Sequence, residues 1–208
     1  SNYEHLKCNI NPLDSKHNEY KIVDEYLQNT SHGNRLKLLE VFTLERENEA
    51  KLFNPLKLNN KKLLWHGSRF SNFVGIISNG MRIAPPEAPK TGYNFGKGVY
   101  FADLAGKSAP YCCPYLSGGV GLFVLCEVAL GKPRELLRPN CNAASLPLDC
   151  HSTHAVGTSR PNPAGSLQVK DVEIPMGKME SFPKGGMGAN EWVVYNTNQI
   201  KMKYLVKF

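Results

Sequence analysis

The segment GKGVYFADLAGKSAPYC, residues 96–112, poses the central question of this sequence. Two glycines flank a lysine, and an apolar, strand-like run and a stretch of small residues follow them. A Gly-x-Gly-x-x-Gly dinucleotide loop would require a third glycine at position 101, where Phe101 stands, and a strand before the glycines rather than after them. The segment is therefore a failed nucleotide loop, an ordinary turn, or a site that holds a nucleotide in another way.

The composition around this segment is that of one globular domain. The chain has 208 residues, 41% of them hydrophobic and 21% charged, which suffices for one sizeable core and excludes a disordered protein. No apolar run approaches the length of a membrane span, and we expect neither a leader peptide nor a membrane partner. A net charge of +7 favours an anionic ligand or partner, although the scattered lysines do not indicate direct nucleic-acid binding.

The six cysteines show no Cys-x-x-Cys spacing, and in a chain of this length we expect them to be free thiols. One cluster contains residue types that bind metals, namely Cys141, Cys150, His151 and His154. Zinc ligands usually come in pairs roughly two to four residues apart, whereas these two cysteines are much more widely spaced. We therefore expect a polar surface loop here and no metal site.

Hydrophobic periodicity predicts two helices in the first 80 residues. Residues 15–30 place apolar side chains on one face, with Ser15 in position to cap the start. Residues 71–80 form the second helix, with Ser71 as the N-cap and Gly80 as the stop.

The rest of the chain is predicted to contain more strand than helix. A long loop over residues 84–98 carries three prolines and three glycines, and such loops are usually functional. After it, Asp103 should cap a short helix that runs through Ser108 and that Pro110 ends. Strands are expected at residues 33–46, 62–67, 98–102, 120–131, 190–196 and 199–208. One face of the last strand should carry Ile200, Met202, Tyr204, Val206 and Phe208. Short turns between strands favour an α+β fold with mainly antiparallel pairing.

Three polar residues stand at the ends of apolar strands: His66, Tyr100 and Glu191. Each has an ordinary interpretation, as a core histidine, a strand aromatic and an edge charge. An acidic residue directly before a very apolar strand is costly if it is buried, however, unless another group stabilises it. Together the three residues deserve a functional interpretation.

The sequence context of these residues resembles a known family. Residues 63–112, LLWHGSRFSNFVGIISNGMRIAPPEAPKTGYNFGKGVYFADLAGKSAPYC, are similar to the catalytic signature of the poly(ADP-ribose) polymerases of the DNA-damage-responsive branch. Residues 190–208, NEWVVYNTNQIKMKYLVKF, resemble the closing strands of that family. The resemblance extends from about residue 3 to residue 208 and includes the His–Tyr–Glu triad in order.

The resemblance implies an ADP-ribosyltransferase fold with two mainly antiparallel sheets and flanking short helices around an NAD+ cleft. It implies a single catalytic domain over residues 1–208. The helical regulatory domain and DNA-binding modules of the branch are expected to be absent from this chain, which is either a fragment or lacks them naturally. The chain alone should then consume NAD+ without DNA. The family holds NAD+ without a Rossmann unit, so the GKG sequence is not expected to cradle phosphate.

The resemblance also implies how the nicotinamide end of NAD+ is bound. The backbone of Gly67 and the hydroxyl of Ser108 should bind the nicotinamide amide. Tyr111 should stack on the nicotinamide ring, and Tyr100 should close the pocket from another side. Lys107 should lie close to the reacting ribose.

The adenosine end is expected to be bound by residues that follow the first triad member. By resemblance, His66 and Ser68 should hold the adenosine ribose hydroxyls, and Asn72 and Arg82 should lie near the adenosine and pyrophosphate. The loop over residues 84–96, which contains Tyr93, should flank the donor. No metal is implied.

The resemblance assigns the chemistry to one carboxylate, that of Glu191. Cleavage of the ribose–nicotinamide bond passes through an oxocarbenium-like transition state, as glycoside hydrolysis does. A glycosidase needs a general acid because its leaving group departs as an alkoxide, whereas nicotinamide leaves NAD+ as a neutral molecule. Glu191 should therefore suffice, by bonding the 2′-hydroxyl of the nicotinamide ribose, stabilising the positive charge and orienting the attacking hydroxyl.

Partners and alternatives follow from the same resemblance. The expected partners are NAD+, acceptor proteins that include the enzyme itself and histones, an accessory protein that completes the site, and DNA through the absent domains. The expected setting is DNA repair in the nucleus. Mono-ADP-ribosylation, an inactive NAD+- or ADP-ribose-binding module and a basic domain that binds polyanions are the alternatives. Pro110 and Trp192 stand where the family often has asparagine and tyrosine.

Overall fold

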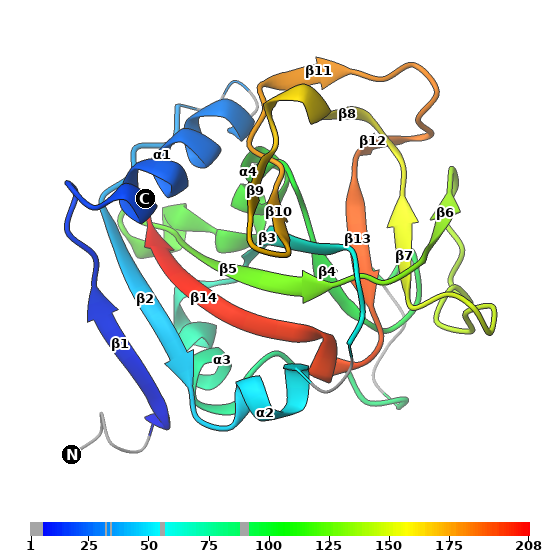
Figure 1. Cartoon of the computed structure of the whole chain (residues 1–208), viewed down its shortest axis with the longest axis horizontal. Coiled ribbons are helices and arrows are strands. Elements are labelled where there is room, and N and C mark those ends of the chain that lie inside the picture. Colours follow the sequence, from blue (N-terminus) through cyan, green and yellow to red (C-terminus); the bar gives the residue numbers. More distant parts are fainter. Residues whose placement is uncertain (1–5, 32, 34, 55–56, 88–91) are drawn as a thin grey trace.

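The computed structural model describes residues 6–31, 33, 35–54, 57–87 and 92–208, and a seven-stranded sheet forms its centre (Figure 1). The strands of this sheet are β1 (Cys8–Pro12), β2 (Glu40–Arg46), β3 (Lys61–Gly67), β5 (Leu122–Ala129), β9 (Leu167–Val169), β10 (Val172–Ile174) and β14 (Ile200–Lys207). They lie in the order β1-β2-β14-β5-β3-β10-β9, and all neighbours are antiparallel except β3 and β10. β14 therefore lies in the interior of the sheet, although it comes last in the sequence.

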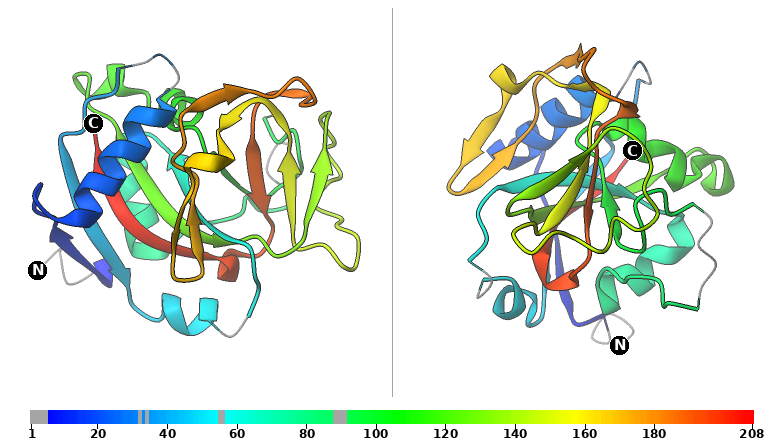
Figure 2. Two further views of the ribbon diagram at one scale, coloured as in Figure 1. Left: turned by 45° about the horizontal axis from the view of Figure 1, so that its top comes forward. Right: turned by 90° about the vertical axis from the view of Figure 1, so that its right-hand side faces the viewer.

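Helices cover both faces of the central sheet (Figures 1 and 2). On one face α1 (Asn18–Thr30) buries Tyr26 and Leu27 against side chains of β3 and β5. On the other face α3 (Phe73–Asn79) buries Phe73 and Ile77. Because both faces are covered, β5 is buried along almost its whole length, as its apolar sequence predicted.

Two smaller sheets lie beside the central one (Figures 1 and 2). The four-stranded sheet has the order β4-β13-β7-β6, with β4 (Val99–Phe101), β13 (Glu191–Val194), β7 (Ser152–Ala155) and β6 (Pro133–Leu136). The three-stranded sheet has the order β11-β8-β12, with β11 (Met179–Ser181), β8 (Gly157–Pro161) and β12 (Met187–Ala189). The α+β fold class is confirmed, with one small sheet more than the two expected.

A β-bridge between Trp65 and Ala102 joins the central sheet to the four-stranded sheet. The backbone N–H of Trp65 donates to the carbonyl of Ala102 at 2.8 Å, and that of Ala102 donates to the carbonyl of Trp65 at 3.0 Å. Trp65 directly precedes His66, and Ala102 lies two residues after Tyr100. The junction thus brings together two strand ends that carry predicted site residues.

The remaining helices are short. They are α2 (Glu49–Phe53), α4 (Ala105–Ser108), η3 (Phe70–Asn72), η4 (Ala109–Cys112), η5 (Pro114–Ser117), η6 (Pro163–Gly165) and η7 (Thr197–Gln199). α4 ends at Ser108, and Pro110 lies in the 3-10 turn that follows, in agreement with the prediction that it ends the helix.

The predicted cap of α1 is wrong. Asp14 Oδ1 accepts a hydrogen bond from the backbone N–H of Lys16 at 2.7 Å, which folds Ser15 into a turn before the helix. The N-cap is His17, whose Nδ1 accepts from the backbone N–H of Glu19 at 3.2 Å.

The predicted cap of α3 is also wrong, whereas its predicted stop is confirmed. Ser71 lies inside η3, and the N-cap is Asn72, whose side chain donates to Ser68 Oγ at 3.0 Å instead of capping the helix. Gly80 ends the helix with a φ of +78°, and its N–H donates to the carbonyl of Ile76 at 2.8 Å.

Two strand predictions need correction. β2 begins only at Glu40, because the carbonyl of Leu36 accepts from Gln28 Nε2 of α1 at 3.0 Å and the preceding segment packs over that helix. In β14, a β-bulge between Met202 and Tyr204 shifts the register. As a result Ile200 and Met202 pack on the face covered by α3, whereas Tyr204, Val206 and Phe208 pack on the face covered by α1. All five side chains are buried, but they do not share one face.

Among the residues that the structure describes, no helix is both long enough and apolar enough to cross a membrane. The six cysteines are free thiols, as predicted.

Candidate active site

The predicted site residues meet in a cleft at the junction of the two larger sheets. Its deeper part, here called the inner pocket, has a volume of about 240 Å³. It is lined by His66, Gly67, Gly92, Tyr93, Asn94, Tyr100, Phe101, Ala102, Lys107, Ser108, Tyr111 and Glu191. The end of β3, the strand β4, the helix α4 and the start of β13 each supply part of this lining.

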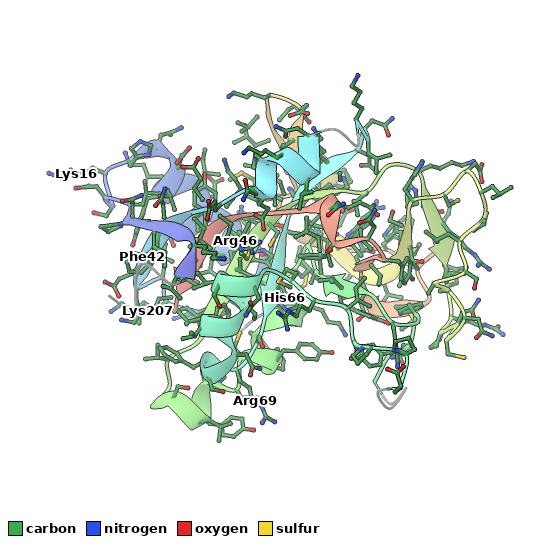
Figure 3. The ribbon with its side chains drawn as sticks, turned by 90° about the horizontal axis from the view of Figure 1, so that it is seen from below. Lys16, Phe42, Arg46, His66, Arg69 and Lys207 are labelled. Carbon is green, nitrogen blue, oxygen red and sulfur yellow. The ribbon has the colours of Figure 1, made fainter. Side chains whose placement is uncertain are left out.

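A wider groove of about 550 Å³ continues from the inner pocket and is here called the outer groove. His66, Tyr93 and Tyr100 line both hollows, so the two hollows adjoin. The outer groove also contains the remaining predicted residues, Ser68, Asn72 and Arg82. Figure 3 shows His66 beside α3, the helix that forms one wall of this groove.

Gly67 is required at the floor of the inner pocket because no side chain fits there. A Cβ atom at this position would lie 2.3 Å from the backbone oxygen of Ser108 and 2.9 Å from Cys112 Sγ. The hydroxyl of Ser108 is buried and donates to the carbonyl of Trp65 over a long distance of 3.3 Å. A polar ligand can therefore approach the backbone closely and find a weakly engaged hydroxyl beside it.

His66 presents an unprotonated ring nitrogen to the cleft. Its Nδ1 lies 2.8 Å from the carbonyl oxygen of Tyr100, and since a carbonyl only accepts, Nδ1 carries the hydrogen. Burial lowers the pKa of His66, which favours the neutral ring. Nε2 is then an acceptor, suited to a hydroxyl donor in the cleft.

The hydroxyl of Tyr100 fixes the end of the long loop. It donates to the carbonyl of Gly96 at 2.7 Å and accepts from the backbone N–H of Phe95 at 2.9 Å. On the other side of the same residue, Tyr195 donates to the carbonyl of Phe95 at 2.7 Å and accepts from Thr153 at 2.8 Å. The loop therefore returns to β4 along a fixed path, and burial raises the pKa of Tyr100 so that its hydroxyl stays protonated.

Glu191 supplies a carboxylate with little solvent around it. The residue is 9% exposed, and within the described residues no hydrogen bond reaches its carboxylate. Lys107 Nζ lies 4.0 Å from Glu191 Oε1. Burial raises the pKa of Glu191, and the charge of Lys107 opposes this effect. The carboxylate is available to a ligand and has a single cation beside it.

The structure brings all eleven predicted residues to the inner pocket or the outer groove. Sequence reasoning did not single out Asn94 or Ala102, although both lie within a few residues of Tyr100. It also assigned Asp103 incorrectly. The N-cap of α4 is Leu104, and the carboxylate of Asp103 is directed into the protein, where it accepts hydrogen bonds from Asn190 and Trp192.

The candidate metal cluster has other contacts. His151 Nδ1 accepts from the backbone N–H of Lys132 at 3.1 Å, and the ring of His154 stacks on Trp192 with a centroid distance of 3.8 Å. Within the described part of the chain, no group of three histidine, cysteine or acidic side chains is arranged so that it could hold a metal ion.

Hollows of about 570 and 510 Å³ at the end of β2 are larger by volume than the inner pocket. They surround Arg46, whose guanidinium is already bonded to Glu49 and to the carbonyls of Ile77 and Ser78 at the C-terminal end of α3 (Figure 3). They lack a group of functional side chains like that of the inner pocket, so we assign the site by chemistry rather than by volume.

Comparison with known proteins finds similarity over nearly the whole chain. The family model for the "Poly(ADP-ribose) polymerase catalytic domain" matches residues 17–208. "Poly [ADP-ribose] polymerase 2" of Homo sapiens is 44% identical over 214 residues, which cover 99% of this chain and 36% of the relative. The protein of the same name from Arabidopsis thaliana is 44% identical over 99% of this chain and 33% of its own. "Poly [ADP-ribose] polymerase 1" of Gallus gallus is 43% identical over 99% of this chain and 21% of the relative. The chain thus spans between about a fifth and just over a third of the length of these relatives.

Proposed function

The chain belongs to the family of poly(ADP-ribose) polymerase catalytic domains, and from this premise we propose that it transfers ADP-ribose from NAD+ to protein side chains and extends it to poly(ADP-ribose), releasing nicotinamide. The observation that supports this most strongly is the lining of the inner pocket, where Glu191 and Lys107 share one hollow with His66 and Tyr100. The outer groove gives the donor molecule room beyond that pocket.

The nicotinamide end of NAD+ is proposed to occupy the inner pocket. The amide binds the backbone of Gly67 and the hydroxyl of Ser108, which are adjacent at the floor. Tyr111, which is 59% exposed at the mouth, stacks on the ring once the ligand is bound, and Tyr100 forms another wall.

The adenosine end is proposed to extend into the outer groove. Nε2 of His66 accepts a hydrogen bond from an adenosine ribose hydroxyl, with Ser68 nearby. Asn72 and Arg82 lie further along the groove, beside the adenosine and the pyrophosphate. Tyr93, which lines both hollows, flanks the donor where they meet.

Glu191 is proposed as the carboxylate that stabilises the transition state. Nicotinamide departs as a neutral molecule, so no acid is needed, and the charge that develops on the ribose is positive. A carboxylate in a site with little water interacts strongly with such a charge. The same carboxylate orients the hydroxyl that attacks during elongation, and Lys107 favours its ionised form by lowering its pKa.

The wider setting is part of the proposal because the chain spans only part of its relatives. We propose protein acceptors that include the enzyme itself and histones, a nuclear location, and a role in DNA repair. An accessory protein that completes the site, and DNA acting through further domains, remain predictions of the resemblance.

The test compares the wild-type chain with Glu191→Gln, using NAD+ labelled in its adenylate part, with and without nicked DNA. Product size on a gel separates polymer from single units, and released nicotinamide measures turnover. We expect Glu191→Gln to lose about 10²- to 10³-fold in rate and to make no polymer, while NAD+ binding by calorimetry is retained. Glu40→Gln, which removes an exposed carboxylate on β2, is the matched control and should behave as wild type.

Normal polymer from Glu191→Gln would refute the assignment of Glu191. NAD+ binding without nicotinamide release by the wild-type chain would refute catalysis and favour a binding module. A large increase in rate on addition of DNA would contradict the expectation that this chain works without it.

A further inference from the structure

Asp103 is a buried carboxylate that the proposed chemistry does not use. It lies between β4 and α4 and is 3% exposed. Its Oδ2 accepts two hydrogen bonds, from Asn190 Nδ2 at 2.8 Å and from Trp192 Nε1 at 3.0 Å. Its Oδ1 is buried and has no hydrogen-bond partner among the described residues. Such a group costs stability relative to an apolar side chain of similar size, so its presence calls for a reason other than stability.

The two donors to Asp103 are the residues on either side of Glu191. Successive side chains in a strand point to opposite faces. Trp192 packs in the hydrophobic cluster under α3, whereas Val193 packs on the other face of the sheet with Tyr100 and Phe95. Asp103 therefore contacts β13 on the face opposite to that of Glu191, and it binds both neighbours of Glu191, Asn190 and Trp192.

The same two neighbours are held from a second direction. Asn190 Oδ1 accepts from the backbone N–H of Gly157 at 2.8 Å and lies 3.1 Å from His154 Nε2. The ring of His154 stacks on that of Trp192 at a centroid distance of 3.8 Å with the planes 5° apart. Both flanking side chains are thus fixed between Asp103 and the β7–β8 segment, which leaves the start of β13 little freedom to rotate.

Asp103 also begins the segment that carries Lys107 and Ser108. Both of these residues line the inner pocket, and Lys107 Nζ lies 4.0 Å from Glu191 Oε1. One carboxylate oxygen thus connects the base of α4 to the strand that bears Glu191, across 87 and 89 residues of sequence.

We propose that Asp103 is a positioning residue for Glu191: by accepting from Asn190 and Trp192, it sets the orientation of Glu191 and its distance from α4. This inference rests on the proposed function of Glu191. The role requires an acceptor oxygen at this place and not a negative charge. Loss of the acceptor should lower the rate of the chemical step and leave NAD+ binding nearly unchanged, because the hydrogen bonds of Asp103 go to the two neighbours of Glu191 and not to the residues proposed to bind NAD+.

The experiment compares two substitutions of nearly the same size. Asp103→Leu removes the acceptor, whereas Asp103→Asn keeps one acceptor oxygen. We expect Asp103→Leu to lower kcat for nicotinamide release by about 10- to 100-fold with little change in KM for NAD+, and Asp103→Asn to retain most of the wild-type kcat. Glu49→Leu is the control for lost stability, because it removes another buried carboxylate acceptor, which binds the backbone N–H of Met202 at 2.6 Å in the central sheet.

A second measurement does not depend on activity. The chain has two tryptophans, so its NMR spectrum should contain two indole N–H signals. The indole of Trp65 has no hydrogen-bond partner among the described residues, while that of Trp192 donates to Asp103. Asp103→Leu should move the Trp192 signal to the position of a free indole and leave the Trp65 signal in place. Trp192→Phe removes one of the two donors and should lower kcat by several-fold, also with little change in KM.

Several results would overturn the inference. An unchanged kcat in Asp103→Leu, with the Trp192 signal shifted, would show that the contact does not position Glu191. Equal losses in Asp103→Leu and Asp103→Asn would show that the charge matters and not the acceptor. If Asp103→Leu does not fold, Trp192→Phe takes its place. An unchanged kcat in that variant would likewise show that the contact with Asp103 does not position Glu191. A wild-type chain that releases no nicotinamide would refute the proposed function and the inference with it, whereas an active wild type and an equally active Asp103→Leu would refute the inference alone.

Discussion

Replacing Asp103 with asparagine should change how the stability of the protein depends on pH. Burial raises the pKa of Asp103 from its ordinary value of 3.8 to about 6, against the opposing effect of the hydrogen bonds from Asn190 and Trp192. In the unfolded chain the carboxyl group titrates at its ordinary value. Between these two pH values the folded state binds more protons than the unfolded state, so stability falls as the pH rises.

The size of this effect follows from the two pKa values. The interval between 3.8 and about 6 corresponds to roughly 3 kcal/mol of stability, present below the lower value and lost as the pH passes the upper one. About 2 kcal/mol of it is lost between about pH 4.5 and pH 7.5. Asparagine does not titrate, so Asp103→Asn lacks this contribution, and any constant effect of the substitution cancels when the two pH values are compared.

Urea denaturation of the wild-type protein and of Asp103→Asn at the two pH values measures the difference in unfolding free energy. From the lower to the higher pH, we expect the unfolding free energy of the wild type to fall by about 2 kcal/mol more than that of Asp103→Asn. Lys62 and His154, two titratable groups that interact with this network, are present in both proteins. A difference that stays the same at both pH values would refute the reasoning that a buried carboxylate is held here at a cost to stability.

Three further predictions concern the pocket and the sheet. Gly67→Ala places a Cβ atom 2.3 Å from the backbone oxygen of Ser108, so we expect it to lose about 1–3 kcal/mol of stability and at least about tenfold in NAD+ affinity by calorimetry. Lys107→Met removes the charge that lowers the pKa of Glu191, so the acid limb of the rate–pH profile should move to higher pH. Deleting Lys203 removes the extra residue of the β-bulge in β14 but leaves Met202 opposite Cys126 and Tyr204 opposite Leu125, so every later side chain keeps its face and we expect the cooperative thermal unfolding transition to remain.

Matched variants make these outcomes decisive. Gly188→Ala adds a methyl group where nothing lies within 4 Å, outside the cleft, and should leave stability and NAD+ affinity nearly unchanged. Lys107→Arg keeps the charge and should leave the acid limb where it is. Deleting Leu205 instead turns Val206 and Phe208 to the opposite face of the sheet and should abolish that transition. If a matched variant behaves like its partner, the steric, electrostatic or register argument behind that prediction fails.

The residues that the sequence singled out lie together in the cleft, and they could be singled out because they belong to short, distinctive segments at strand ends. His66 and Gly67 end one apolar strand, and Tyr100 lies in another, so local pattern and motif agree about them. Two features could not be predicted in this way. Asp103 follows the local rule for a helix cap, but its carboxylate instead accepts hydrogen bonds from donors nearly ninety residues away.

The bulge in β14 is the second such feature. Alternating apolar residues continue through Lys203 without interruption, and that pattern ordinarily indicates one buried face. Here α1 and α3 cover both faces of the sheet, so an apolar side chain is accommodated on either side. Periodicity cannot locate a change of face when both faces are buried.

The order of strands in the sheets has a consequence for the newly made chain on the ribosome. β14 pairs with both β2 and β5, and β13 pairs with both β4 and β7, yet these two strands are translated after all of their neighbours. Until they emerge, each sheet lacks an interior member, and the nascent polypeptide carries neither Glu191 nor a closed cleft. The site proposed for catalysis is therefore incomplete during most of the synthesis of this domain, and the unfinished sheet edges are open to pairing with other strands during that time.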